Sequence, residues 1–388
     1  MSFDALYVFL GVKVLPLAYA IIGFGLLIAI HECGHFLFCK LFGIHTPTFS
    51  IGFGPEIFRR KIGKTDFRLA AIPMGGYVEI AGLAEVGQGD QAHSQVTGPE
   101  SFDSKPYWQK LLVLSGGIIF NLIFAYLVFC RLFMIGSSNQ QGLMVSGVVK
   151  ASAAKKGGLK AGDVIIAINQ DSLRDESHNL RENAQEMLLK AIRSNPEKAV
   201  TITVERDNKP TDLAITLGER KEGGESIGSL GAELRTPIPR LPFFQAIKAG
   251  IHATNGWIIA IVYSVKQLIT QRSLEGAGGP VMIMSMSFDA AQHGLLALLT
   301  FLALISINLA LINVLPIGAL DGGQIFFVTL EAIIGRKLPL LFKNIVNITS
   351  WLFFISLAVF LTYRDIATLF GTKITGVVKK LLSIAGLR

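Results

Sequence analysis

Long apolar runs constrain this chain more than any other feature, because a helix needs about 20 mostly apolar residues to cross a bilayer. Four segments meet that need: residues 1–39, 111–136, 294–323 and 345–363. Only 16% of the 388 residues are charged, whereas soluble domains carry roughly 25%. The sequence therefore predicts an α-helical polytopic membrane protein with four transmembrane helices.

The regions between the predicted spans differ from one another in composition. Residues 40–110 alternate polar and apolar side chains between glycines, which predicts a region of membrane-associated β-hairpins. Residues 142–219 contain short strand-like segments around one helix, which predicts a single inserted α+β domain. Residues 240–272 mix apolar and charged side chains, which favours an amphipathic helix on the membrane surface, with a fifth span as the alternative. Residues 364–388 remain as a C-terminal tail.

Basic residues near the ends of the spans predict the orientation. Loops rich in Lys and Arg stay in the cytoplasm. Residues 40–110 contain eight of these residues, whereas the first thirteen residues contain only Lys13. The hairpin region is therefore expected on the cytoplasmic side and the domain at 142–219 on the other side. The formal net charge of +8 comes without a block of Lys and Arg interleaved with aromatic residues, so membrane lipid rather than nucleic acid is the expected contact.

Three ionisable side chains lie in the first apolar run, in the segment HECGH. On a helix His31 and His35 are i and i+4, so both imidazoles project from one face. Two nitrogens so placed can share one Zn²⁺, and Glu32 can take a proton from water that the ion activates. Each ionisable residue at bilayer depth costs roughly 2.5–3.5 kcal/mol, so the pattern predicts a metal site rather than a chance match.

A catalytic zinc site usually needs a third protein ligand. Asp321, in the segment NVLPIGALDGGQ, is the candidate because it is the only carboxylate between Asp289 and Glu331. The proline and glycines around it predict a broken helix end that can face a cavity. Two alternatives remain open. Asp321 could simply cap the following helix, or Cys39, one turn beyond His35, could be the third ligand.

Five features in chain order resemble the site-2 protease family of intramembrane zinc metalloproteases. They are HECGH in the first span, FSIGFGP and IPMGGYV in the following loop, an insertion similar to a PDZ domain, and NVLPIGALDG in a later span. The resemblance covers nearly the whole chain and points to the bacterial RseP branch, peptidase family M50B. It implies that His31, His35 and Asp321 bind Zn²⁺ and that Glu32 is the catalytic base.

The resemblance also implies a reaction and a location. The expected activity is that of a zinc metalloendopeptidase that cuts transmembrane segments of single-span membrane proteins. Anti-sigma-factor-like proteins and remnant signal peptides are the expected substrates, and the bacterial inner membrane is the expected location. The active site is expected toward the cytoplasm, the PDZ-like domain outside it, and the protein as a monomer.

Residues of the later span are candidates for holding the substrate. The resemblance suggests this role for Asn308, Asn313 and Pro316. Buried amides can hydrogen-bond a strained backbone or a developing oxyanion. The alternative is that the two asparagines only form ordinary hydrogen bonds between helices.

A strand in the first loop is a second candidate for holding the substrate. IPMGGYVEI could pair with an unwound segment by β-augmentation, or it could be an ordinary hairpin that covers the cytoplasmic face. In the first case the glycines at Gly75 and Gly76 would permit close backbone approach, and Tyr77 would lie at the membrane interface.

The chain departs from the family pattern at two points. The family often has proline where this chain has Gly318, and well-known RseP members carry two tandem PDZ domains where one is predicted here. The PDZ-like domain could bind the trimmed end of a substrate or exclude bulky proteins by size. The rival interpretation is a non-catalytic scaffold that binds transmembrane helices. The presence of Glu32 argues against it, because a binding protein has no use for a carboxylate beside a metal.

Overall fold

The computed structural model describes residues 14–83, 97–136, 142–149, 151–176, 179–181, 183–222, 225–235, 237–271 and 278–384. The predicted first and last segments therefore extend outside the described residues, as does part of the predicted hairpin loop. The chain forms two compact units, one from residues 1–130 with 249–388 and the other from residues 131–248. Each unit has its own packing.

Four of the described helices are long and apolar enough to cross a membrane, which agrees with the predicted polytopic membrane protein. They are α2 (Leu15–Leu41), α4 (Gly116–Ile135), α9 (Leu295–Asn313) and the Leu340–Thr368 part of α11 (Leu340–Ile384). The predicted third span, 294–323, is too long, because the helix stops before the turn that contains Pro316. The predicted fourth span, 345–363, is too short, because the helix continues through polar residues on both sides.

Local sequence signals set the ends of α2. Pro16 lies in the first turn, where its missing N–H removes no helical hydrogen bond. Gly43 adopts a left-handed conformation with φ 65°, and the N–H of Ile44 donates to the carbonyl of Cys39 at 2.8 Å. This is a Schellman-type end, and it turns the chain from the helix into the following strand.

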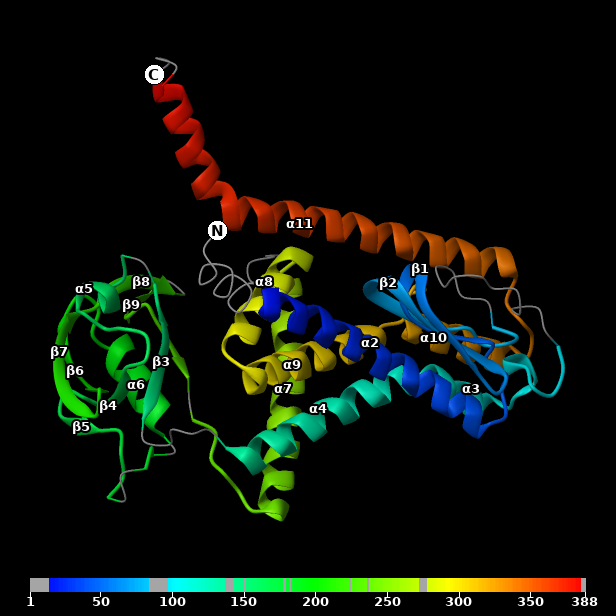
Figure 1. The fold of residues 1–388 in the computed structure, drawn as a ribbon, viewed down its shortest axis with the longest axis horizontal. Helices are drawn as coiled ribbons and strands as arrows, with labels where there is room; N and C mark the ends of the chain where they lie inside the picture. The colour runs from blue at the N-terminus through cyan, green and yellow to red at the C-terminus, as the bar shows by residue number, and fades with distance from the viewer. Residues whose placement is uncertain are drawn as a thin grey trace. The chain divides into compact units, whose positions relative to one another are not determined.

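The second predicted span, 111–136, is interrupted in the structure. Helix α3 (Tyr107–Leu114) ends at Ser115, and α4 begins at the next residue. In the first unit, α2 packs against α8 (Pro280–Gln292) and α9, while α10 (Asp321–Ile334) packs against α3 (Figure 1). These contacts bring segments that are distant in the sequence together around α2 and α3.

The loop after α2 contains two paired strands, β1 (Thr48–Ile62) and β2 (Thr65–Val78), which form an antiparallel ribbon. Ser50 is opposite both Arg68 and Tyr77, so the far end of β2 folds back along the start of β1. Strand β2 packs against α2 (Figure 1). The contact includes the far end, because a Cβ atom at Gly76 would lie 2.8 Å from the Ile28 side chain. The described part of this loop also contains the short helix η2 (Phe102–Ser104).

The second unit is built on a six-stranded sheet whose main strands follow the order β10-β3-β4-β6-β7, with β5 paired to β4. Its apolar core includes Leu143, Ile165, Leu188 and Ile202. The predicted domain boundary at residue 219 omits strand β10, which pairs with β3. The elements of this unit and of the segment that follows it are β3 (Leu143–Val148), α5 (Ala153–Lys156), β4 (Val164–Ile168), β5 (Asp171–Ser172), α6 (Ala184–Arg193), β6 (Ala199–Arg206), β7 (Lys209–Thr216), β8 (Gly218–Glu222), β9 (Glu225–Ser229), β10 (Ala232–Arg235) and α7 (Phe243–Gln271).

Candidate metal centre

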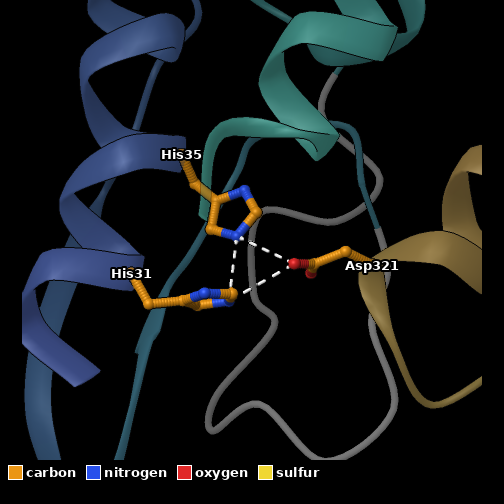
Figure 2. A group of neighbouring side chains, drawn as sticks. All are labelled: His31, His35 and Asp321. Atoms are coloured by element: carbon orange, nitrogen blue, oxygen red, sulfur yellow. Dashed lines mark hydrogen bonds and ion pairs between the residues drawn. The ribbon is translucent and has the colours of Figure 1, made fainter. Parts of the chain in front are cut away.

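Three side chains from two helices converge in the first unit (Figure 2). Nε2 of His31 lies 3.4 Å from Nε2 of His35. The Oδ2 atom of Asp321 lies 3.3 Å from the first nitrogen and 3.6 Å from the second. In the part of the chain that the structure describes, this is the one group of three or more His, Cys, Asp or Glu residues whose ligand atoms could hold a metal ion.

The burial of the group is compatible with a bound cation. The side chains of His31, His35 and Asp321 are 12%, 9% and 19% exposed. Oδ2 of Asp321 is buried and has no hydrogen-bond partner. A buried polar atom without a partner is costly, and this one faces two ring nitrogens that can each present a lone pair.

His35 is held in place by the interruption between α3 and α4. Its Nδ1 atom lies 2.8 Å from the carbonyl oxygen of Val113, two residues before the break at Ser115. A carbonyl can only accept, so Nδ1 carries the proton and Nε2 is left with a lone pair. The broken helix therefore orients this imidazole toward Asp321.

His31 lies against the first turns of α4. Its Nδ1 atom is 3.0 Å from Nδ2 of Asn121, a fully buried residue of α4. A Cβ atom at Gly117 would lie 2.3 Å from the His31 ring, so only glycine leaves room for the imidazole. The backbones also touch, because a Cβ atom at Gly34 would lie 2.1 Å from the carbonyl oxygen of Gly116. Small residues at helix contacts in membranes allow such approach.

Asp321 reaches the histidines because the chain turns sharply between α9 and α10. It is the first residue of α10, and Leu320 precedes it as the N-cap residue. The two following glycines pack directly on the turn. A Cβ atom at Gly322 would lie 2.4 Å from the carbonyl oxygen of Leu315, and a Cβ atom at Gly323 would lie 2.2 Å from the carbonyl oxygen of Ile317. Close backbone packing thus fixes the position of the carboxylate.

Glu32 lies beside the group on α2 and is 8% exposed. Its carboxylate interacts electrostatically with His31, His35 and Asp321, and the backbone N–H of Val78 donates a hydrogen bond to it. The far end of β2 passes so close that a Cβ atom at Gly76 would lie 3.4 Å from the Glu32 side chain. One buried acid is thus available next to the three potential ligands.

The two alternatives to Asp321 as the third ligand were a ligand role for Cys39 and a capping role for Asp321. Cys39 is fully buried in an apolar cluster with Ile44 and Phe49, and it is not part of the three-residue group. Asp321 does not act as the N-cap of α10 through its side chain.

The predicted substrate residues lie around this centre with different surroundings. Asn313 is buried at the end of α9 and Pro316 is exposed in the turn. Asn308 donates from Nδ2 to the carbonyl of Leu304 at 3.1 Å, one turn earlier in its own helix. The predicted strand residues lie in β2, where a Cβ atom at Gly75 would lie 1.8 Å from the ring of Phe53.

Sequence reasoning did not identify Val113, Gly117 or Asn121. The carbonyl of Val113 leaves no sequence signal. Asn121 could have been found, because it is a polar residue in a mostly apolar span and lies one turn after Gly117 on the same face.

The model of peptidase family M50 matches residues 19–357 of the chain. The chain belongs to peptidase family M50, the site-2 protease family. A putative zinc metalloprotease of Synechocystis is 33% identical over 346 residues, which cover 87% of this chain and 91% of the relative. The regulator of sigma-W protease RasP of Bacillus subtilis is 29% identical over 424 residues, which cover 90% of this chain and 98% of the relative. The chloroplastic membrane metalloprotease ARASP of Arabidopsis thaliana is 30% identical over 352 residues, which cover 88% of this chain and 77% of the relative.

This M50 protein is therefore a zinc metalloprotease of the membrane, and Zn²⁺ is the cofactor that its relatives imply. The three converging side chains fit that ion. Ligand atoms about 2.0–2.1 Å from a tetrahedral Zn²⁺ lie about 3.3–3.4 Å apart, and the three observed separations are 3.3, 3.4 and 3.6 Å. Two imidazoles and a carboxylate are also a donor set that catalytic zinc sites use.

Proposed function

We propose that this M50 protein cuts transmembrane segments of single-span membrane proteins at a zinc centre held by His31, His35 and Asp321. The observation that carries the proposal is the convergence of Oδ2 of Asp321 on two ring nitrogens, at 3.3 and 3.6 Å in a buried site. The family matches support proteolysis, and the four apolar helices support a membrane-embedded substrate.

Glu32 is the general base in this proposal. When bound, Zn²⁺ activates a water molecule and polarises the scissile carbonyl. Glu32 accepts the proton of the attacking water and returns it to the leaving amine. The backbone N–H of Val78 supports this role, because it donates to the carboxylate and orients it.

The substrate helix has to unwind before its peptide bonds can be attacked. The backbone of β2 at Gly75, Gly76 and Tyr77 is the segment that we assign to holding the unwound chain by strand addition. Its passage beside Glu32 supports this assignment. The strands also line a cavity of about 370 Å³ that includes Tyr77 and Phe53, whose rings stack with centroids 6.3 Å apart.

The turn that carries Asp321 supplies the second set of proposed substrate contacts. Asn313 ends the helix before the turn, Pro316 lies in the turn, and Asn308 lies five residues before Asn313 on α9. We assign to them the polar and apolar contacts that hold the chain near the scissile bond. The hydrogen bond from Asn308 to its own helix makes Asn313 the stronger candidate of the two amides.

The proposed location is the bacterial inner membrane, with the centre toward the cytoplasm and the second unit outside it. Anti-sigma-factor-like proteins and remnant signal peptides are the proposed substrates, in line with the similarity to the regulator of sigma-W protease RasP. The second unit, a PDZ-like α+β domain, either captures a trimmed chain end or excludes bulky proteins.

A cleavage assay with the Glu32→Gln variant tests the function. Purified full-length protein in detergent, supplied with Zn²⁺, is incubated with a single-span substrate, and products are separated by mass. The variant is expected to bind zinc as the wild type does and to cleave at least about 100-fold more slowly, because removal of a general base costs roughly 10²–10⁴-fold in rate.

Glu79→Gln is the matched control, because Glu79 is also 8% exposed and lies in the same unit. It is expected to cleave at the wild-type rate. Undiminished cleavage by Glu32→Gln would refute Glu32 as the base. A wild-type protein that binds zinc and substrate but never cuts would favour the non-catalytic scaffold.

A further inference from the structure

We propose that Asn121 is the residue that positions His31, through an amide oxygen that accepts the Nδ1 proton of the imidazole. The inference rests on the proposed zinc centre. Its basis is the contact between the two side chains, at 3.0 Å, inside a helix packing in which Asn121 is fully buried. No other described residue is hydrogen-bonded to Nδ1 of His31.

The orientation of the amide follows from the chemistry of its neighbours. The two ends of an Asn amide have the same shape, so the hydrogen-bond network decides which end is oxygen. With Nδ2 toward His31, Nδ1 has to accept, and the proton of the neutral ring then sits on Nε2. That is the atom that faces His35 and Asp321, and a protonated nitrogen cannot bind a metal ion.

The opposite orientation removes this conflict. The Oδ1 atom of Asn121 is buried without a hydrogen-bond partner when Nδ2 faces the ring. A half-turn of the amide places Nδ2 at that site instead, so the tautomer of His31, and not this atom, decides the orientation. The half-turn brings Oδ1 to the ring, where it accepts from Nδ1–H and leaves Nε2 with a free lone pair. Metal-binding histidines commonly donate their second N–H to such a partner, which fixes the tautomer and the ring orientation.

The packing of α4 supports a dedicated role for this residue. Gly117 lies one turn before Asn121 and leaves space for the His31 ring, since any side chain there would collide with it. His35 has an equivalent partner in the Val113 carbonyl. The two histidines thus have one acceptor each, a backbone oxygen for His35 and a side-chain oxygen for His31, and only the second can be changed by mutation.

Zinc affinity measured by competition with a chelator tests the inference on the full-length protein in detergent. Asn121→Leu has a similar volume and no acceptor, and it is expected to bind zinc about 10–100-fold more weakly. Asn121→Asp offers oxygen at both ends of the side chain and is expected to keep the wild-type affinity. The visible spectrum of Co²⁺-loaded protein should change in the first variant and stay unchanged in the second.

Ser306→Ala is the matched control. Its hydroxyl donates to the backbone carbonyl of Asn121 at 2.9 Å, so the variant weakens the same helix contact without touching His31, and it should keep its zinc. Wild-type zinc affinity in Asn121→Leu would overturn the inference. So would a loss of affinity in Asn121→Asp or in Ser306→Ala equal to that in Asn121→Leu. If the Leu variant does not fold, zinc loss in Asn121→Asp alone overturns it. A wild-type protein without zinc would instead refute the metal centre itself.

Discussion

At the scale of single residues, Asp163 shows how one buried charge can stabilise the second unit. It is 2% exposed. Arg206 donates to its two oxygens from Nε and Nη2, each at 2.7 Å, and the backbone N–H of Lys160 donates a third hydrogen bond. Burial alone would raise the pKa of Asp163, but these hydrogen bonds outweigh it and hold the pKa below its ordinary value. The folded unit therefore prefers the ionised carboxylate.

Asp163→Asn is expected to lower the free energy of unfolding of this unit by about 2 kcal/mol at pH 7, because hydrogen bonds to charged groups contribute roughly 1.5–3 kcal/mol. Because the pKa of Asp163 is lower in the folded protein than in the unfolded chain, its ionised carboxylate stabilises the fold at any pH above the unfolded-state pKa, about 3.9 for Asp. This stabilisation is lost as the pH falls through the pKa of the folded state. The gap between wild type and variant should therefore close below about pH 4.

Hydrogen exchange of the strands in the second unit, followed from pH 7 to pH 3 in the intact protein, measures that gap. Asp171→Asn, at an exposed position of β5, is the control and should exchange as the wild type does. A gap that is absent at pH 7, or one that stays constant down to acid pH, would contradict the expected role of Asp163.

The residues of the metal centre differ in how far the sequence could predict them. His31 and His35 have a fixed spacing on a helix, so geometry alone places both rings on one face. Asp321 is the only carboxylate between Asp289 and Glu331, and the need of a catalytic zinc site for a third ligand pointed to it. Val113 acts through a backbone oxygen that every residue possesses, so no sequence pattern could have identified it. The zinc-binding role of Asp321 and the proton-transfer role of Glu32 stay predictions.

At the scale of secondary-structure elements, the turn between α9 and α10 positions Asp321 through backbone contact. Gly323→Ala would put a Cβ atom 2.2 Å from the carbonyl oxygen of Ile317, so the start of α10 has to move away by more than an ångström to restore normal contact. Metal sites tolerate displacements of only about 0.5 Å. The variant is therefore expected to bind zinc at least about tenfold more weakly.

Zinc content after dialysis against a weak chelator measures this loss, and helix content by circular dichroism shows whether the fold survives. Gly25→Ala is the matched control, because Gly25 lies in α2 and a Cβ atom there would meet nothing within 4 Å. It should retain its zinc. If Gly323→Ala also retains it, the glycine contact does not fix the carboxylate.

The elements that follow from strong periodic signals were easier to predict than the breaks between them. Apolar runs predicted four spanning helices, but the end of α9 at Asn313 depends on how the turn packs against α10. The interruption at Ser115 was not predicted, because Ser is compatible with a helix and the break coincides with a tertiary contact from His35. Strand β10 was missed because four residues, Ala232–Arg235, give too short a pattern.

At the scale of the whole molecule, the second unit is an insertion whose two ends meet. A Cβ atom at Gly136 would lie 2.7 Å from that of Arg240, and the N–H of Leu241 donates to the carbonyl of Phe133 at 2.8 Å. Inserted domains commonly have adjacent ends, so the rest of the chain can be connected across a short gap when the domain is removed. The sequence predicted the insertion from its composition, but not where its two ends come together.

Replacing residues 137–239 with a short Gly-Ser linker is therefore expected to leave the metal centre intact. His31, His35 and Asp321, with Val113 and Asn121 behind the two rings, all belong to the first unit. The shortened protein should bind an equimolar amount of zinc and should still cleave a small single-span substrate in detergent. Elemental analysis and the cleavage assay measure the two properties.

The same variant separates the two roles left open for the PDZ-like domain, because each role predicts a change in the cleavage of a different substrate. If the domain excludes bulky proteins, its removal should increase cleavage of an untrimmed substrate and leave that of a trimmed one unchanged. If it captures a chain end, cleavage of the trimmed substrate should fall toward that of the untrimmed one. Loss of zinc from the shortened protein would contradict the expectation that the metal centre stays intact, since it would mean that the first unit cannot hold its ligands together without the insertion.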